Sequence, residues 1–586
     1  MVKWIHALCW DDNIMKFSTK TIKRYFRGKF RSDLSAGLTV AMIVIPQSMA
    51  YAAIAGINPI YGLFTAIIPT IIAAIFGSFP YLITGPTNPT ALVTASLLVN
   101  FANRSDYFEY VFALSIIAGL VYLVFGIFKL GSIIRYVSNS VLVGFLTAIG
   151  VIIISYQFGN LLGVELLHEK SIWGIITNLG NFLSNINLYT MIISGFSFFL
   201  LLILRRVNRK IPAALITIIL ATLLVFLTGW SSGQNVRLVS DFQLPEKIKL
   251  GFHVPNISLK EFSTLGVSGA ALAVFGLMET LSIAKAMSQM TGEKLDPSRQ
   301  MIGQGLALFT GGFFQCMPAS GSPSRTVINV VNGARTRFSA IISGLGVLLF
   351  LMLFSGLLGY IPVAALAAVV IVSAAGLINF SLIKLTWQSH KQSRAVMIIT
   401  FISTLVLPLE YAIFLGILTT LVIHLGETSH MNLSYFIENE EGQFIEYPLQ
   451  GLEKQTPHIA IINIEGDLFF AAVQDLQDQV ERILETDIKV LILRFRRTHL
   501  LASTGIMALD HIVRLAHDKK VHILFCGLQD EVLIPLEAAG VTDMVGESRI
   551  FLANNQLFSS THKALATAKQ ILEEQTQAEA PTKNQS

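Results

Sequence analysis

Fourteen hydrophobic segments follow one another through the first three quarters of this chain. Acidic residues are sparse between Ser32 and Leu425, and long runs of this region contain none. Of the 586 residues, 53% are hydrophobic and only 13% are charged, against about 25% charged in ordinary soluble proteins. The pattern predicts a polytopic α-helical membrane domain, and the more charged sequence after Glu427 predicts a soluble domain.

The positions of the segments give a prediction of the domain boundaries. The segments lie at residues 34–55, 61–78, 87–101, 108–128, 133–157, 188–204, 211–228, 264–288, 299–315, 325–332, 338–358, 362–378, 395–409 and 411–425. The expected parts are a basic N-terminal segment (1–32), a transmembrane domain (33–426), a linker (427–457), a soluble domain (458–573) and a disordered tail (574–586). The first 32 residues are basic and contain no small-residue cleavage site, so no cleaved signal peptide is expected.

The basic residues between the segments predict the orientation in the membrane. If the N-terminus is inside, an alternating path brings every compact basic cluster to that same side, which is the cytoplasmic side by the positive-inside rule. These residues are Lys129, Arg135, Arg205, Arg206, Arg209, Lys210, Lys294, Arg299, Arg335, Arg337, Lys384, Lys391 and Arg394. We therefore expect both termini in the cytoplasm, in a plasma membrane or a bacterial inner membrane. The net charge of +5 belongs to these loops and does not indicate nucleic-acid binding.

Two stretches inside the apolar region are broken by several Pro and Gly residues. They are Phe79–Thr90 and Gln315–Thr326, and each leads into a hydrophobic run too short to cross a bilayer. Irregular backbone at membrane depth is tolerated only where it is buried in protein or lines a cavity. Fourteen spans divide into two halves of seven, and the breaks fall at spans three and ten, which is the same position in each half. Because each half has an odd number of spans, the second half is inverted in the membrane relative to the first. A matched pair of this kind is typical of a transporter's binding site.

Charge inside the predicted spans indicates an anion site. The two short helices would point their N-termini, which are partially positive, into one cavity, and Arg325 adds a permanent charge there. Glu279 is the only acidic residue well inside a span, where a carboxylate must be paired, protonated or bound to a cation. It could carry a proton, or hold sodium with oxygen atoms of Thr280 and Ser282. Alternatively, it forms a fixed ion pair with Arg325 or Lys285.

Several short motifs, taken together, resemble the sulfate permease (SulP) family of anion transporters. They are Ala36–Val40, Ile45–Ala52, Asn58–Leu63, Ile83–Pro86, Gly276–Thr280 and Ser322–Thr326. The similarity covers nearly the whole chain and includes a C-terminal domain of the STAS type. It implies a core domain and a gate domain, an elevator-like movement, a homodimer, and an anion site between spans one, three, eight and ten.

The resemblance also implies roles for individual residues by their position in the motifs. It assigns the lining of the anion site to Gln47, Tyr51, Thr87, Ser324 and Arg325. Glu279 occupies the eighth-span position at which family members carry an acidic residue linked to cation coupling or to core integrity. A structural role is the alternative for Gln47 and Ser324, since polar side chains also bond one helix to another in membranes.

Strands and helices alternate after His458, which predicts a small sheet backed by helices. The expected strands are 459–464, 489–495 and 521–525, and the expected helices are 473–484, 503–516, 531–538 and 563–572. STAS domains of anti-sigma-factor antagonists carry a phosphorylatable Ser preceded by Asp, whereas Ala502 precedes Ser503 here. We therefore expect Ser503 or Thr504 to cap a helix rather than to be phosphorylated.

These observations predict secondary active transport of a small inorganic anion, sulfate first, driven by H⁺ or Na⁺ and without a cofactor. An enzyme is not expected, because the sequence has no metal-ligand spacing, nucleophile elbow or acid–base pair, and its three cysteines form no disulfide or metal framework. Direct ATP drive is not expected either, because no nucleotide-binding loop is present. The alternatives are transport of bicarbonate, chloride or dicarboxylates, an anion exchanger, a passive anion channel, and a nucleobase permease. Glu279 disfavours a channel, and Arg325 with the STAS domain disfavours a nucleobase.

Overall fold

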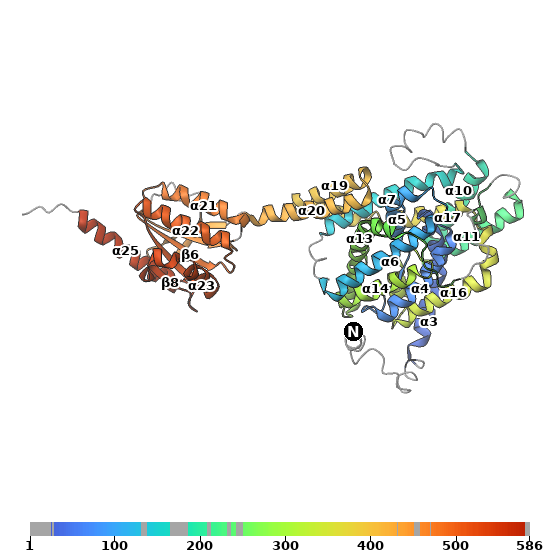
Figure 1. The fold of residues 1–586 in the computed structure, drawn as a ribbon, viewed down its shortest axis with the longest axis horizontal. Helices are drawn as coiled ribbons and strands as arrows, with labels where there is room; N and C mark the ends of the chain where they lie inside the picture. The colour runs from blue at the N-terminus through green and yellow to red at the C-terminus, as the bar shows by residue number, and fades with distance from the viewer. Residues whose placement is uncertain are drawn as a thin grey trace, which may run out of the picture. The chain divides into compact units, whose positions relative to one another are not determined.

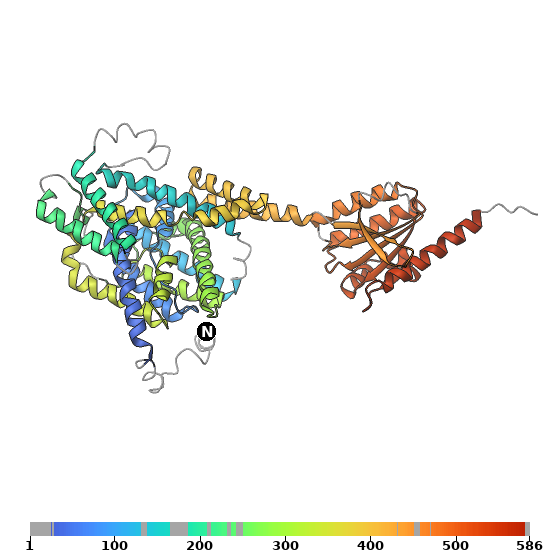
Figure 2. The ribbon, with the colours of Figure 1, turned by 180° about the vertical axis from the view of Figure 1, so that it is seen from behind.

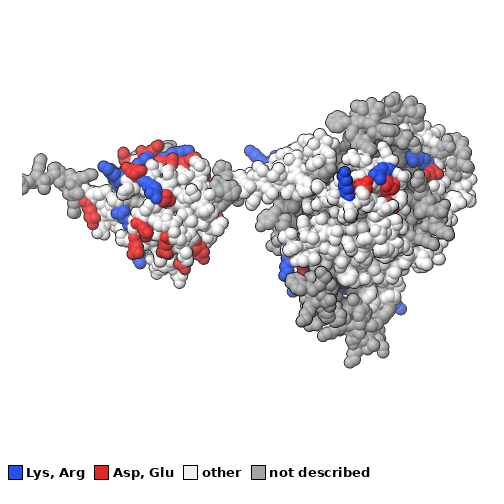
Figure 3. Space-filling model, viewed as in Figure 1, with Lys and Arg blue, Asp and Glu red and all other residues white. Residues whose placement is uncertain are grey.

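The chain divides into two units, Met1–Thr420 and Leu421–Ser586, at a boundary inside helix α20 (Leu409–Ser429). The computed structural model describes residues 25, 28–130, 138–164, 186–207, 212–230, 236–241, 250–429, 432–449, 458–468 and 470–579. Most of the predicted N-terminal segment lies outside these residues. Arg135, Arg209 and Lys210, three of the basic residues that predicted the orientation in the membrane, also lie outside them. Charged side chains are closely spaced on the second unit and sparse over much of the visible face of the first (Figure 3).

The first unit is a bundle of apolar helices (Figures 1 and 2). Its main helices are α3 (Phe30–Ile54), α4 (Pro59–Phe76), α5 (Asn88–Leu97), α6 (Tyr107–Ile127), α7 (Asn139–Leu162), α10 (Leu188–Val207), α11 (Ala213–Thr228), α13 (Leu259–Thr291), α14 (Pro297–Gly312), α15 (Pro323–Val331), α16 (Phe338–Phe354), α17 (Val363–Ala375), α18 (Phe380–Gln388), α19 (Lys391–Val406) and α20. Each of the fourteen predicted segments overlaps one of these helices, and α18 was not predicted. Among the described residues, eight helices are long and apolar enough to cross a membrane.

Several helices begin where a polar side chain can satisfy the free N–H groups of the first turn. Side-chain oxygens of Asn58, Thr87, Ser258 and Asp296 accept hydrogen bonds from the backbone at the starts of α4, α5, α13 and α14. A proline stands in the first turn of α4, α5 and α14, where its missing N–H costs nothing. These local signals explain why α5 begins at Asn88, near the end of the first break.

Helices α3 and α4 approach closely at Gly62. A Cβ atom at this position would lie 1.9 Å from the backbone oxygen of Ser48, which cannot move without shifting α3. We therefore expect Gly62→Ala to lower the stability of the membrane unit by about 1–3 kcal/mol or more, as overpacking does. Thermal unfolding of the purified protein in detergent measures the effect. Gly195→Ala is the matched control, because a Cβ atom there meets nothing within 4 Å; equal melting temperatures for the two variants would contradict the prediction.

The second unit contains a six-stranded sheet in the order β4-β3-β5-β6-β7-β8. The strands are β3 (Asn432–Glu438), β4 (Phe444–Pro448), β5 (Ile459–Glu465), β6 (Val490–Arg497), β7 (His522–Leu528) and β8 (Ile550–Leu552). Strands β5 to β8 are parallel, with Val490 opposite both Ile459 and His522, whereas β3 runs antiparallel to β4 and β5.

Helices cover both faces of this sheet (Figures 1 and 2). One apolar core joins the sheet to α21 (Phe470–Leu484), α22 (Ser503–Asp518), α23 (Asp530–Ala538) and α24 (Val541–Val545). A second core joins the opposite face to α25 (Ser559–Glu579) through Ala564, Leu565 and Ala568. Burial in this sheet raises the pKa of the Cys526 thiol to about 12, so this cysteine stays protonated and unreactive at neutral pH.

Three predictions for the C-terminal region need correction. The predicted linker 427–457 is wrong for residues 432–448, which supply β3 and β4; the β3–β5 pairing that fixes them is not visible in local sequence. The tail expected to be disordered from residue 574 is helical as far as Glu579. The predicted cap is also wrong, because Ala502 is the N-cap of α22 and no side chain caps it. Ser503 lies in the first turn with its side chain exposed.

Candidate functional site

The two broken stretches meet in the interior of the first unit. Strand β1 (Thr84–Gly85) pairs antiparallel with β2 (Ser320–Gly321), although more than 230 residues separate them in the chain. The backbone N–H of Ser322 also donates to the oxygen of Ile83 at 2.9 Å. Helices α5 and α15 start directly after these strands, so the N-termini of the two short helices lie next to each other.

Side chains from both broken stretches contact the carboxylate of Glu279. Ser320 Oγ donates to Glu279 Oε2 at 2.6 Å, and Thr87 Oγ1 donates to the same oxygen at 3.4 Å. The two hydroxyl oxygens are themselves 3.0 Å apart. On the next residue of α13, Thr280 Oγ1 accepts from the backbone N–H of Gly321 at 2.9 Å. Both broken stretches are therefore hydrogen-bonded to α13 at Glu279 and Thr280.

Arg325 is buried at the start of α15, with 1% of its surface exposed. Its Nη2 donates to the backbone oxygen of Pro86 at 2.6 Å, which ties α15 to the start of α5. Its buried Nε and Nη1 atoms have no hydrogen-bond partner. Among the described residues, no ion pair within 4.0 Å joins Glu279 to Arg325 or to Lys285. The guanidinium thus keeps donors that an anion could use.

Gly85 makes room for this guanidinium. A Cβ atom at Gly85 would lie 2.9 Å from Nη1 of Arg325, and that atom is at the end of a flexible side chain. We expect Gly85→Ala to leave the fold intact and to displace the guanidinium, with a loss of about tenfold or more in anion affinity. Anion-binding titrations of the purified protein measure this loss. Gly266→Ala on α13, where a Cβ atom meets nothing within 4 Å, is the control; unchanged affinity in Gly85→Ala would refute the prediction.

The other predicted site residues occupy different environments. Gln47 and Tyr51 are buried on α3, and Gln47 Oε1 has no hydrogen-bond partner. Helix α3 packs against both α5 and α15, so these side chains belong to the same part of the bundle as the breaks. Ser324 is exposed in the first turn of α15, and its hydroxyl lies 3.5 Å from that of Ser322. The structure thus brings Thr87, Glu279 and Arg325 together and leaves Ser324 outside their hydrogen bonds.

Sequence reasoning did not single out the residues that hold the breaks in position. Gln300 Oε1 accepts from the backbone N–H groups of Ser78 and Phe79, at 2.9 Å each. Gln304 Nε2 donates to Thr84 Oγ1 at 2.6 Å. Both glutamines are buried on α14, four residues apart. Two amide side chains at that spacing in an apolar span lie on one face of a helix, so the sequence could have indicated that they bond to a neighbouring segment. Ser320 had no comparable signal, because its importance depends on the pairing of β1 with β2.

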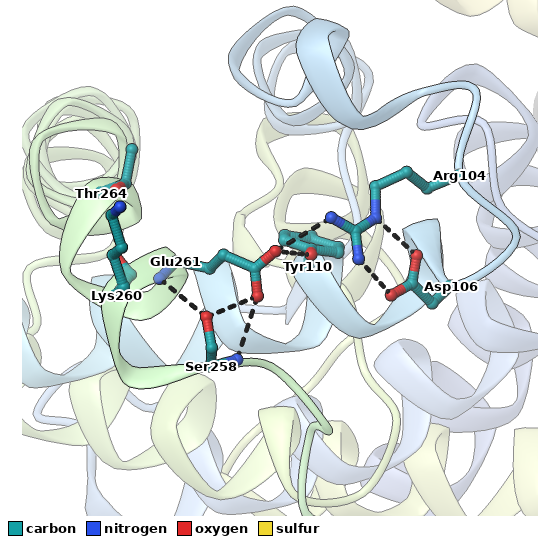
Figure 4. Close-up of polar contacts among 7 residues, drawn as sticks. All are labelled: Arg104, Asp106, Tyr110, Ser258, Lys260, Glu261 and Thr264. Atoms are coloured by element: carbon teal, nitrogen blue, oxygen red, sulfur yellow. Dashed lines mark hydrogen bonds and ion pairs between the residues drawn. The ribbon is translucent and has the colours of Figure 1, made fainter.

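A polar cluster fixes the start of α13, the helix that carries Glu279 further along (Figure 4). Arg104 forms ion pairs with Asp106 and Glu261, at 2.9 Å each. Glu261 also accepts from the Tyr110 hydroxyl at 2.6 Å and completes a capping box with Ser258. These bonds join α13 to α6 and to the connection that precedes α6. We assign the cluster a structural role, because its ion pairs and hydrogen bonds satisfy one another.

Comparison with known proteins gives the family. Residues 30–400 match the sulfate permease family, and residues 453–564 match the STAS domain. The chain belongs to the sulfate permease family. It is 27% identical over 571 residues to the low affinity sulfate transporter 3 of Stylosanthes hamata, a match that covers 91% of this chain and 87% of that protein.

Solved structures of other anion transporters share the fold. The murine solute carrier 26 family member A9 in its inward-facing state matches with a TM-score of 0.83 and 18% identity, over 97% of this chain and 98% of that chain. The transmembrane domain of the cyanobacterial bicarbonate transporter BicA matches with a TM-score of 0.58 and 22% identity, over 67% of this chain and 97% of that domain. The predicted fold, a polytopic helical membrane domain followed by a small α/β STAS domain, is confirmed. This sulfate permease family member is an anion transporter and not an enzyme.

Proposed function

We propose that this family member is a secondary active transporter of sulfate. The observation that carries the proposal is the Arg325 guanidinium, which is buried between the starts of two short helices and has two nitrogen atoms without a partner. An always-ionised group at this depth is costly unless it is paired or serves a ligand, and the Pro86 oxygen satisfies only one of its nitrogen atoms. The name of the Stylosanthes hamata relative supports sulfate as the anion.

The proposed site binds the anion with one charge and several neutral donors. Backbone N–H groups in the first turn of α15, which no side chain caps, replace part of the hydration shell, and the dipoles of α5 and α15 favour negative charge. Gln47 and Tyr51 on α3 complete the lining, together with Thr87 and Ser324 at the helix starts. Binding by hydrogen bonds from short helices is suited to a tetrahedral oxyanion, whose oxygen atoms accept in several directions.

Glu279 is the proposed coupling residue. Its carboxylate receives hydrogen bonds from Ser320 and Thr87, and its position near Arg325 lets its charge respond to the anion. Either H⁺ or Na⁺ could be the coupling ion, since a carboxylate binds a proton, and hydroxyl oxygens beside it could complete a sodium site. Movement of a core domain past a gate domain, as in an elevator, would carry the loaded site across the bilayer. A 7+7 inverted repeat, a homodimeric assembly and cytoplasmic termini also belong to this proposal.

Sulfate uptake into proteoliposomes tests the proposal. We expect radiolabelled sulfate to accumulate above equilibrium when an inward pH or sodium gradient is imposed, and not to do so without a gradient. The gradient that drives accumulation identifies the coupling ion. Downhill flux alone would favour a channel, and uptake that requires an internal anion would favour an exchanger.

Bicarbonate is the second candidate, because the structure of a bicarbonate transporter matches this membrane unit. Both anions carry oxygen acceptors, and the size of the pocket must separate them. Competition decides between them: an excess of unlabelled bicarbonate should leave sulfate uptake unchanged if sulfate is the substrate. Inhibition by bicarbonate, together with gradient-driven uptake of labelled bicarbonate, would replace sulfate as the proposed substrate.

A further inference from the structure

Helix α18 presents apolar side chains that the protein itself does not cover. None of its nine residues, all of which the structure describes, is buried. Phe380 is 77% exposed, Leu385 65% and Trp387 52%. The helix packs at its side against α7 and α19 and begins at Asn379, whose side chain caps it. Exposing this much apolar surface to water would be unfavourable, so something else must cover it.

Basic residues flank this apolar surface without any acidic counterpart. Lys384 lies on α18, and Lys391 and Arg394 lie in the first turn of α19. Residues 297–409 contain no Asp or Glu. Within the described part of the chain, no carboxylate lies within 4.0 Å of these three cations. The Arg394 guanidinium lies 5.9 Å from the ring centre of Trp387, and its Nε has no hydrogen-bond partner.

We propose that α18 and the start of α19 form a binding surface for the headgroups of anionic lipids. A short helix with exposed aromatic and aliphatic side chains lies in the boundary layer of a bilayer, where Trp residues are enriched. Cations beside such a helix attract negatively charged lipid, and each contributes a severalfold preference, about fivefold per Lys or Arg near the surface. The Phe380, Leu385 and Trp387 side chains insert among acyl chains, while Lys384, Lys391 and Arg394 contact phosphate groups. The proposal depends on the membrane fold and not on the identity of the transported anion.

Fluorescence quenching of Trp387 in proteoliposomes tests this proposal on the full-length protein. The difference in emission between the wild type and Trp387→Phe isolates the signal of this residue from those of the other tryptophans. Vesicles of phosphatidylcholine contain a minor fraction of brominated lipid, either phosphatidylglycerol or phosphatidylcholine. We expect brominated phosphatidylglycerol to quench Trp387 at least about twice as strongly as brominated phosphatidylcholine, and expect high salt to reduce this ratio.

Charge variants complete the test. Lys384→Gln combined with Lys391→Gln should bring the quenching ratio close to one. Lys260→Gln combined with Lys519→Gln removes the same number of charges elsewhere and should leave the ratio unchanged. Equal quenching of the wild type by both lipids, or a ratio that survives the Lys384 and Lys391 changes, overturns the proposal. Absence of quenching by either lipid overturns it as well, because the face would then be covered by protein, such as a second copy of the chain.

Discussion

Arg325→Ala is expected to weaken sulfate binding by about 30-fold or more and to reduce sulfate uptake to background. The change removes the buried positive charge at the start of α15, together with the two guanidinium nitrogen atoms that have no protein partner. Losing charge-assisted bonds to a desolvated ligand costs about 2–5 kcal/mol, and each 1.4 kcal/mol is a tenfold change in Kd. Binding titrations with labelled sulfate and uptake into proteoliposomes measure the two effects separately.

Two further variants separate binding from folding at this position. Arg325→Lys retains the charge but loses the planar fork and the bond to Pro86, so we expect affinity between those of the wild type and Arg325→Ala. Arg514→Ala is the matched control, because it removes an exposed arginine that pairs with Asp510 on α22. Wild-type sulfate affinity in a folded Arg325→Ala protein would exclude Arg325 from the site and leave it a structural role.

Glu279→Gln is expected to abolish gradient-driven accumulation of sulfate while sulfate binding persists. Glutamine has nearly the same shape and can still accept the hydrogen bond from Ser320, but it neither takes up a proton nor neutralises a cation. Coupling should therefore fail without collapse of the hydroxyl cluster around residue 279. The measurement compares sulfate accumulation under imposed pH and sodium gradients with sulfate binding in the same preparation.

A carboxylate outside the site provides the control for Glu279. Asp518→Asn neutralises an exposed acid at the end of α22 and should preserve accumulation. If Glu279→Gln still accumulates sulfate in response to a gradient, another residue couples transport. If instead the variant no longer folds, the acid serves core integrity, which is the second role that the family resemblance allows.

Much of the architecture could be read from local sequence. Each span carries its own hydrophobicity, so all fourteen predicted segments overlap helices in the structure. The Pro and Gly residues of the two breaks likewise restrict the backbone locally, and the charge of Arg325 at membrane depth is visible without a fold. In the second unit, every predicted strand from β5 to β7 agrees with the structure, because buried parallel strands are continuous apolar runs.

Other features depend on partners that are distant in the chain. Strands β3 and β4 have mixed polarity, and β3 is held by pairing with β5 while β4 pairs with β3, so their sequence was indistinguishable from a linker. The role of Ser320 arises only when β2 pairs with β1 and brings its hydroxyl to Glu279. Gln300 and Gln304 act on a break that lies about 220 residues before them.

The sequence by itself determined the helices, the two breaks and the charges placed at membrane depth, because hydrophobicity, backbone restriction and ionisation are properties of single residues and their neighbours. Only the tertiary structure decided which polar groups meet. It joined the breaks through β1 and β2, left two Arg325 nitrogen atoms without a protein partner, and kept Arg325 from forming an ion pair with Glu279. Hydrogen bonds act over about 3 Å, so contacts between segments hundreds of residues apart are fixed by packing and not by local pattern.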